Sequence, residues 1–356
     1  MGLPSHQDHK ARSNSAANYV RHRPETTLFY QIVQEYWPEF QAELANHGKY
    51  LPTYVTKEFD EYLKCGRLEH GFLRVRCESC HDEKLVAFSC KKRGFCPSCG
   101  ARRMADSAAL LVDEVLPHQP MRQWVLSVPF PLRFLFASNP KAMTGVLGIV
   151  YRAISTHLTQ KAGLKKSATQ TGAVTLIQRF GSALNSNIHF HMLFLDGVYS
   201  STGHPKWFRQ VKAPSSAELT RLTHTIAQRV GRYLERQGLV ERDTGNIFLV
   251  QDAGVSDEDP SNQLFGSSIT YRIALGPQQG RKVFTLQTLP DIGSNNPGTT
   301  RVGEVSGFSL HAGVATKANE RAKLERLCRY ITRPAVSTKR LSMTRNGRVR
   351  YELNQK

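Results

Sequence analysis

The sequence NIHFHMLFLDG (Asn187–Gly197) places two histidines two residues apart inside an apolar run. Side chains of a β-strand alternate between its two faces, so His189 and His191 are expected to point one way while Phe190 and Met192 point the other. Two imidazoles on one face of a strand can hold one cation. The alternative interpretation is a pair of core or edge histidines that backbone groups satisfy, and the strand by itself does not exclude it.

The composition indicates a polyanionic partner. The 356 residues include 48 Lys plus Arg against 29 Asp plus Glu, which gives a formal net charge of +19. Such an excess is typical of proteins that bind nucleic acid. No stretch reads as a membrane span or a secretory signal, because the apolar run from Trp124 to Ala137 is interrupted by Pro129, Pro131 and Arg133. We therefore expect a soluble, cytoplasmic protein with no membrane partner.

The chain length favours two or three domains, and the pattern of apolar residues predicts their limits. We expect a basic, disordered tail at residues 1–25, a helical and zinc-binding domain at 26–116, and a second domain at 117–356. Mixed strands and helices indicate an α+β fold. The sequence predicts helices at 27–44, 52–63, 102–115, 143–158, 217–237 and 319–332, the last with Asn319 as N-cap, and strands at 123–128, 172–179, 188–195, 268–274 and 282–287.

Six of the seven cysteines lie between Cys65 and Cys99, as is typical of metal modules in reducing compartments. Two short knuckles, Cys77-x-x-Cys80 and Cys96-x-x-Cys99, are separated by fifteen residues. This spacing predicts a zinc ribbon in which four thiolates surround a tetrahedral ion. Two further thiols leave the ligand set open, because either could replace a knuckle member or form a second site with His70 or His81: Cys65 and Cys90.

A tyrosine on a basic helix is the third chemical feature. Helical spacing places Arg326 at i−4 and Arg333 at i+3 from Tyr330, on its own face. The segment 317–350 holds eleven basic residues against two glutamates, a net of +9. A half-buried tyrosine at a helix boundary is the plainer interpretation, but here the phenol lies within a surface suited to phosphate groups.

These features together resemble a known family. A hydrophobic residue between two histidines on a strand, followed by a tyrosine on a helix, resembles the HUH endonucleases. Several sequence motifs are similar, more narrowly, to those of the transposases of the insertion-sequence ninety-one family. These proteins join an N-terminal zinc-binding domain to a catalytic domain like that of rolling-circle initiators. The resemblance covers about residues 27 to 352 and is carried by the segments 74–77, 89–99, 124–133, 183–199 and 329–334.

The resemblance implies a fold and a mechanism. It implies a central antiparallel sheet flanked by helices, with His189 and His191 binding Mg²⁺ or Mn²⁺ and Tyr330 as the nucleophile. Related folds take a third metal ligand from a neighbouring strand, for which Gln178 is our candidate and His311 the second choice. The enzyme would cleave and rejoin single-stranded ends of its own mobile element through a 5′-phosphotyrosine.

Two departures from the family pattern also follow from the resemblance. Some members carry a second tyrosine four residues before the nucleophile, where this chain has Arg326, so we expect a single-tyrosine enzyme. The sequence also stops soon after Arg350, whereas family members usually continue, which predicts a shortened copy. A protein of this class would lie with DNA at the nucleoid.

Three other functions remain open from the sequence. A replication initiator or relaxase would use the same residues, although the chain has no helicase motif. A zinc-dependent DNA-binding regulator, such as an inactive remnant of a transposase, would use Tyr330 and His189 only structurally. A metallohydrolase would cleave without a covalent intermediate, but it would need further ligands. The DNA target and the oligomeric state are left open.

Overall fold

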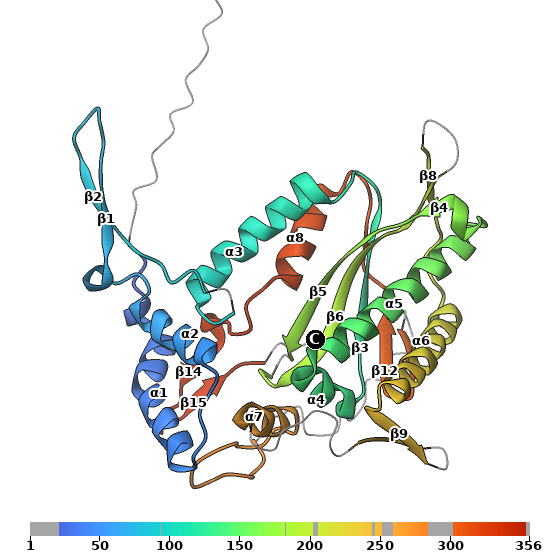
Figure 1. The fold of residues 1–356 in the computed structure, drawn as a ribbon. Helices are drawn as coiled ribbons and strands as arrows, with labels where there is room; N and C mark the ends of the chain where they lie inside the picture. Colours follow the sequence, from blue (N-terminus) through green and yellow to red (C-terminus); the bar gives the residue numbers. More distant parts are fainter. Residues whose placement is uncertain are drawn as a thin grey trace, which may run out of the picture.

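The structure is a computed structural model that describes residues 21–353, apart from residues 93, 182, 202–205, 244–245, 251–258 and 284–301. Residues 1–20 of the expected tail lie outside this part of the chain. Figure 1 shows the elements in their chain order.

The N-terminal part is helical and carries one long hairpin. Its elements are η1 (Pro24–Thr26), α1 (Leu28–Asn46), α2 (Thr53–Lys64), η2 (Leu68–His70), β1 (Phe72–Arg76), β2 (Glu83–Ala87), α3 (Pro97–Leu110) and the π-helical turn η3 (Leu111–Val115). The hydroxyl of Thr27 accepts the N–H of Tyr30 and so caps α1. Aromatic side chains of α1 and α2 form a small core, in which the rings of Trp37 and Phe59 stack 4.1 Å apart.

An antiparallel sheet forms the centre of the remaining chain. Its path is β11-β12-β3-β6-β5, and β13 pairs with the start of β3. The strands are β3 (Met121–Ser127), β5 (Ala173–Phe180), β6 (Ser186–Leu195), β11 (Val302–Val305), β12 (Phe308–His311) and β13 (Ala315–Thr316). Smaller sheets are formed by β4 (Thr169–Gln170) with β7 (Gly197–Ser200) and β8 (Phe208–Gln210), by β9 (Val240–Asp243) with β10 (Asn246–Leu249), and by β14 (Leu341–Met343) with β15 (Val349–Tyr351).

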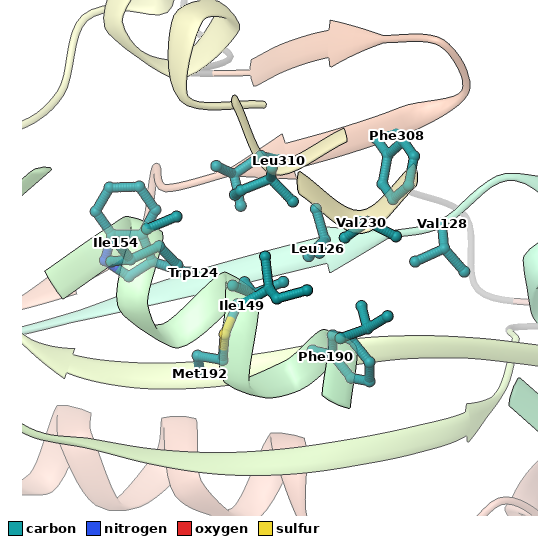
Figure 2. Close-up of a cluster of buried hydrophobic side chains, with 14 of the residues drawn as sticks. Trp124, Leu126, Val128, Ile149, Ile154, Phe190, Met192, Val230, Phe308 and Leu310 are labelled. Carbon is teal, nitrogen blue, oxygen red and sulfur yellow. The ribbon is translucent and has the colours of Figure 1, made fainter. Parts of the chain in front are cut away.

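Helices cover both faces of this sheet. The first face is covered by α4 (Phe130–Ser138), α5 (Pro140–Lys161), α6 (Ser216–Arg236) and α7 (Pro260–Ile269). The second face is covered by α3 and α8 (Arg321–Ile331). Two short 3-10 helices are η4 (Lys166–Ala168) and η6 (Thr338–Arg340). The larger core lies on the first face. It contains Phe190 and Met192 of β6 together with Trp124 and Leu126 of β3 (Figure 2).

Local sequence explains how α5 and α6 form one layer. Ser215 and Glu218 make a capping box at the start of α6, in which each side chain binds the backbone N–H of the other residue. A Cβ atom at Gly145 of α5 would lie 2.1 Å from the hydroxyl of Tyr233, so glycine is needed where α6 crosses. The two helices therefore pack closely at this point.

The C-terminal segment returns to the N-terminal helices. Leu341 of β14 and Val336 pack against the aromatic core of α1 and α2, and Figure 1 shows β14 and β15 beside α1. Because of this contact, the segment after α8 is tied to the cysteine-bearing part of the molecule.

The expected α+β architecture is confirmed, with N-terminal helices, a cysteine cluster that could bind zinc, and antiparallel sheets. The six predicted helices all form, within a few residues. Two details are wrong: Glu320, not Asn319, precedes α8, and residues 268–269 end a helix instead of starting a strand, because α7 begins at the Asp259 cap and Pro260. Most of the strand predicted at 282–287 lies outside the described residues. In the described chain, no helix is both long and apolar enough to span a membrane.

Candidate active site and cysteine cluster

The two histidines of β6 lie on the second face of the sheet, under α8. Cross-strand pairing places His189 opposite Gln178 of β5 and His191 opposite Leu176. Gln178 Oε1 lies 2.8 Å from Nε2 of His189 and 3.1 Å from Nε2 of His191. A β-bulge directly after Gln178 bends β5 at this point. The sheet thus brings three polar side chains to one point.

The hydrogen bonds around these rings fix what they present to that point. The backbone oxygen of Asn187 lies 2.8 Å from Nδ1 of His189 and accepts its proton, so Nε2 carries a lone pair. That lone pair faces the Gln178 oxygen, which is also an acceptor. The same oxygen lies within hydrogen-bond distance of Nε2 of His191. The Gln178 amide nitrogen is buried and has no hydrogen-bond partner among the described residues. A cation at this point would satisfy the converging acceptors.

Burial keeps both imidazoles neutral. Desolvation lowers the pKa of His189 and, with the neighbouring His189 and Arg333 charges, lowers the pKa of His191 to about 3. His191 is 4 % exposed. Both rings are therefore neutral at neutral pH. Neutral imidazole is the form that binds metal ions.

Tyr330 lies directly above the histidine pair. The centroid of its ring is 6.2 Å from that of His191, with the two rings at 79°. The guanidinium carbon of Arg333 lies over the tyrosine ring at 4.4 Å from its centroid. Tyr330 is 48 % exposed, so part of the residue is open to a substrate. The predicted tyrosine, Arg333 and both histidines therefore gather in one place.

Two other predicted residues lie outside this group. Arg326 is exposed on α8, one turn before the tyrosine, and the contact with the Tyr330 ring comes from Arg333 instead. His311 of β12 is in register with Val125 of β3, which pairs in turn with His191. It is therefore two strands away, ~10 Å at the usual strand spacing, while Gln178 touches both rings.

Sequence reasoning missed Gln123. Its side-chain nitrogen lies 2.8 Å from Nδ1 of His191, and the residue is 5 % exposed. If its amide is turned by 180°, its oxygen accepts a proton from Nδ1 and leaves Nε2 of His191 free. A lone glutamine in the apolar strand β3 was the signal that could have revealed it.

A buried ion pair anchors the far end of β6. Arg122 donates to both carboxylate oxygens of Asp196, at 2.7 and 2.8 Å, and to the backbone oxygen of Ala312. Both side chains are 5 % exposed. The pair joins β3, the end of β6 and the loop between β12 and β13, so it supports the sheet that carries the histidines.

Four thiols meet at the base of the β1–β2 hairpin. The Sγ atom of Cys65 lies 3.7 Å from that of Cys99 and 3.8 Å from that of Cys96, and Cys90 lies 3.7 Å from Cys99. A zinc ion with ~2.3 Å bonds to four sulfurs in a tetrahedron requires sulfur–sulfur distances of about 3.8 Å. Backbone N–H groups of Cys90 and Lys92 donate to two of the sulfurs. The cluster has the dimensions of a tetrathiolate zinc site.

Cys96 and Cys99 join the cluster together with Cys65 and Cys90, the two thiols left open as replacements, whereas Cys77 and Cys80 of the first knuckle lie outside it. Residues 72–87 form a hairpin, which brings its flanks together: the N–H of Gly66 donates to the oxygen of Phe88. Cys65 and Cys90 therefore meet at its base. Cys77 and Cys80 are exposed in the turn at its tip.

The fold and the two sites define a class of protein: an N-terminal cysteine-cluster module joined to an α+β domain with a histidine pair beneath a tyrosine-bearing helix. Two family models match the chain. The model described as "Putative transposase" matches residues 172–356, and that described as "Transposase zinc-binding domain" matches residues 32–128. Searches of curated proteins and of solved structures found no match.

The first model covers more than half of the chain, so the protein belongs to this transposase family, with an N-terminal zinc-binding domain of the insertion-sequence ninety-one type. Membership indicates a nucleic-acid-processing enzyme with DNA as its partner. The zinc-binding match and the cluster of Cys65, Cys90, Cys96 and Cys99 together indicate structural zinc.

Proposed function

We propose that the protein cleaves and rejoins single-stranded DNA through a covalent 5′-phosphotyrosine at Tyr330. One observation carries the proposal: the Tyr330 ring lies 6.2 Å from the ring of His191, whose Nε2 shares the Gln178 oxygen with His189. A nucleophile above a cluster of neutral metal-ligand groups is the arrangement that phosphoryl transfer requires.

The residues present fit a divalent cation. His189, His191 and Gln178 would hold it, with Mg²⁺ or Mn²⁺ as the ions implied by the family. When bound, such an ion polarises the scissile phosphate and stabilises charge that develops on its oxygens. With its amide turned so that the oxygen faces Nδ1, Gln123 would hold the His191 ring in the tautomer that leaves Nε2 free.

The protein's own groups supply the covalent step. The Tyr330 oxygen attacks phosphorus and loses its proton to solvent, while the bond from phosphorus to the 3′ oxygen breaks and that oxygen gains a proton. Arg333, over the ring, is a cation close to the nucleophile and would attract the anionic phosphate of the substrate. The phosphodiester energy is kept in the tyrosine ester, so a second 3′-hydroxyl can reverse the step without ATP.

The substrate follows from the position of the nucleophile. Tyr330 sits on a helix that packs on the sheet through Leu324, Cys328 and Ile331, and only its exposed ring faces outward. A backbone held between this ring and the histidines is reached most easily in a single strand. We therefore propose the single-stranded ends of the protein's own mobile element as substrate.

The N-terminal zinc belongs to the same proposal. Cys65, Cys90, Cys96 and Cys99 are the ligands we propose, because their spacing matches a tetrathiolate site. Zinc there would fold the module formed by α1, α2 and the hairpin.

The test is covalent capture. The protein is incubated with Mg²⁺ or Mn²⁺ and 3′-labelled single strands from the DNA flanking its gene, then run on a denaturing gel. A Tyr330→Phe variant removes the nucleophile. Tyr36→Phe is the matched control, because Tyr36 is 50 % exposed but lies on α1. We expect a labelled adduct from the wild type and the control only, and none after chelation of the metal.

Other outcomes identify the alternatives. Cleavage that persists in Tyr330→Phe without any adduct would show a metallohydrolase. Strand binding without cleavage in every variant would show a DNA-binding remnant. A wild-type adduct that does not need metal would contradict the proposed ion, and would favour the arrangement in which the turned Gln178 amide donates to both histidines.

A further inference from the structure

A basic groove runs between α5 and α6, on the side of these helices that faces away from the sheet. Two adjoining cavities of about 550 and 470 Å³ form it, and Arg229 lines both. Its floor contains Ile149, Ala153 and Leu222. Nothing in the proposed cleavage reaction uses this groove.

Arginines form one continuous stripe along α6. Positions 221, 229, 232 and 236 are separated by eight, three and four residues, which are spacings that share one helix face. Arg152 of α5 faces the stripe across the groove. All five guanidinium groups belong to exposed residues.

The charge of the groove is strongly positive. The two cavities are lined by six basic and two acidic residues, a net of +4: Arg152, Lys161, Arg221, Arg229, Arg232 and Arg236, with Glu218 and Glu235. Glu218 is already bound by Lys161, at 2.6 and 2.8 Å, and by the backbone N–H of Ser215. Glu218 therefore neutralises little of the arginine charge.

We propose that this groove binds the sugar–phosphate backbone of double-stranded DNA, as a second nucleic-acid site. The stripe from Arg221 to Arg236 is ~22 Å long at 1.5 Å per residue. One strand of a duplex presents a phosphate every ~3.4 Å, so about six phosphates pass along this length.

The absence of stacking groups selects duplex over single strand. No Phe, Tyr or Trp is among the described residues that line the two cavities. Single-strand sites hold bases on aromatic side chains, whereas duplex backbone contacts need only cations and hydrogen-bond donors. The lining of the groove therefore matches a site for the backbone of a duplex.

The groove and the tyrosine lie on opposite sides of the sheet. Phe190 and Met192 of β6 face the layer of α5 and α6, whereas His189 and His191 face α8. In Figure 1, α5 and α8 lie on the two sides of β5 and β6. A duplex in the groove would thus leave the site at Tyr330 open to a single strand.

The test is salt-dependent binding of a 20-base-pair duplex and of a single strand of the same sequence, followed by fluorescence anisotropy. The variant Arg229→Gln/Arg232→Gln removes two stripe cations. The control Lys57→Gln/Lys64→Gln removes the same charge from exposed positions on α2. Folding is checked by circular dichroism and zinc content.

We expect the groove variant to lower the slope of log affinity against log salt by about 1.8, which corresponds to roughly 60-fold weaker duplex binding at 0.1 M salt. The control variant should keep the wild-type slope, and the Tyr330 adduct with a short single strand should form normally in both.

Three results would overturn the inference. They are unchanged duplex binding in the groove variant, an equal loss in both variants, and a loss confined to the single strand. None of them bears on the covalent step, which the adduct assay reads separately.

Discussion

Replacing individual cysteines should reveal which thiols hold zinc. Cys90 belongs to the cluster at the hairpin base, whereas Cys77 and Cys80 lie at its tip. The apparent free energy of a structural zinc site is ~10–16 kcal/mol, so an equal division gives about 3 kcal/mol for each thiolate, or roughly 100-fold in affinity. Cys90→Ser should therefore weaken zinc binding by about this factor, and Cys77→Ser/Cys80→Ser should leave it unchanged.

The structural consequence follows from what surrounds the cluster. Phe95, next to Cys96, packs 4.1 Å from Phe59, whose ring stacks on Trp37. Loss of zinc should loosen this aromatic stack. The free energy of zinc binding would be as large as the whole net stability of an ordinary domain, ~5–15 kcal/mol.

The assay combines metal analysis of the purified protein, competition with a fluorescent zinc chelator, and near-ultraviolet circular dichroism of the aromatic stack. One zinc per chain is expected for the wild type and for the hairpin-tip variant. Loss of zinc from the tip variant, with retention in Cys90→Ser, would refute the assignment and restore the two-knuckle ribbon predicted from the spacing.

Three further predictions concern the scaffold. The lysine hydrogen bond to Glu218 lowers the pKa of this carboxyl to about 2 from 4.5, so the stability that the ionised carboxylate contributes is present above pH 4.5 and is lost as the pH falls toward 2. Glu218→Gln should therefore lower the unfolding free energy by about 2 kcal/mol at pH 7, after allowance for partial exposure. A loss of the same size at pH 2, measured by urea denaturation, would contradict this. A Cβ atom at Gly303 would lie 2.5 Å from the backbone of α6, whereas one at Gly313 meets nothing within 4 Å. Gly303→Ala should therefore lower the unfolding free energy by ~1–3 kcal/mol, and Gly313→Ala should not. Equal midpoints of thermal unfolding for the two variants would contradict this prediction. Asp196→Asn should cost ~3–5 kcal/mol because it leaves the buried Arg122 charge unpaired, and the double change Arg122→Met/Asp196→Leu should recover much of that loss in the same denaturation assay.

Local periodicity was enough to predict most elements. The alternation around His189 and His191 places both on one face of β6, and the helical pattern around Tyr330 predicts α8 within two residues at its start. Both signals depend only on near neighbours in the chain. The missed helix α4 shows the limit, because Pro129 and Pro131 look like breakers although proline fits the first turn of a helix.

Pairings between distant segments could not be predicted from spacing. The cysteine ligand set depends on the register of β1 and β2, which decides that Cys65 meets Cys90. The contact of Gln123 with His191 depends on the register of β3 against β6. The groove depends on how α5 packs beside α6, which Gly145 permits and which no local pattern encodes.

The candidate active site arises from one strand that serves two purposes. On the second face of the sheet, β6 presents His189 and His191 first and then Leu193 and Leu195. The two leucines share a buried cluster with Ile331 of α8, so the apolar half of the strand fixes the helix that carries the tyrosine.

The helical rotation then sets the direction of the phenol. Successive residues of a helix are ~100° apart, so burial of Ile331 and Cys328 against the sheet leaves Tyr330 at the edge of the contact, above His191. Arg333, after the end of α8, completes the site by covering the tyrosine ring. The distance between tyrosine and histidines is thus set by the packing of Leu193 and Leu195 against α8, which is why core substitutions on this face should impair adduct formation.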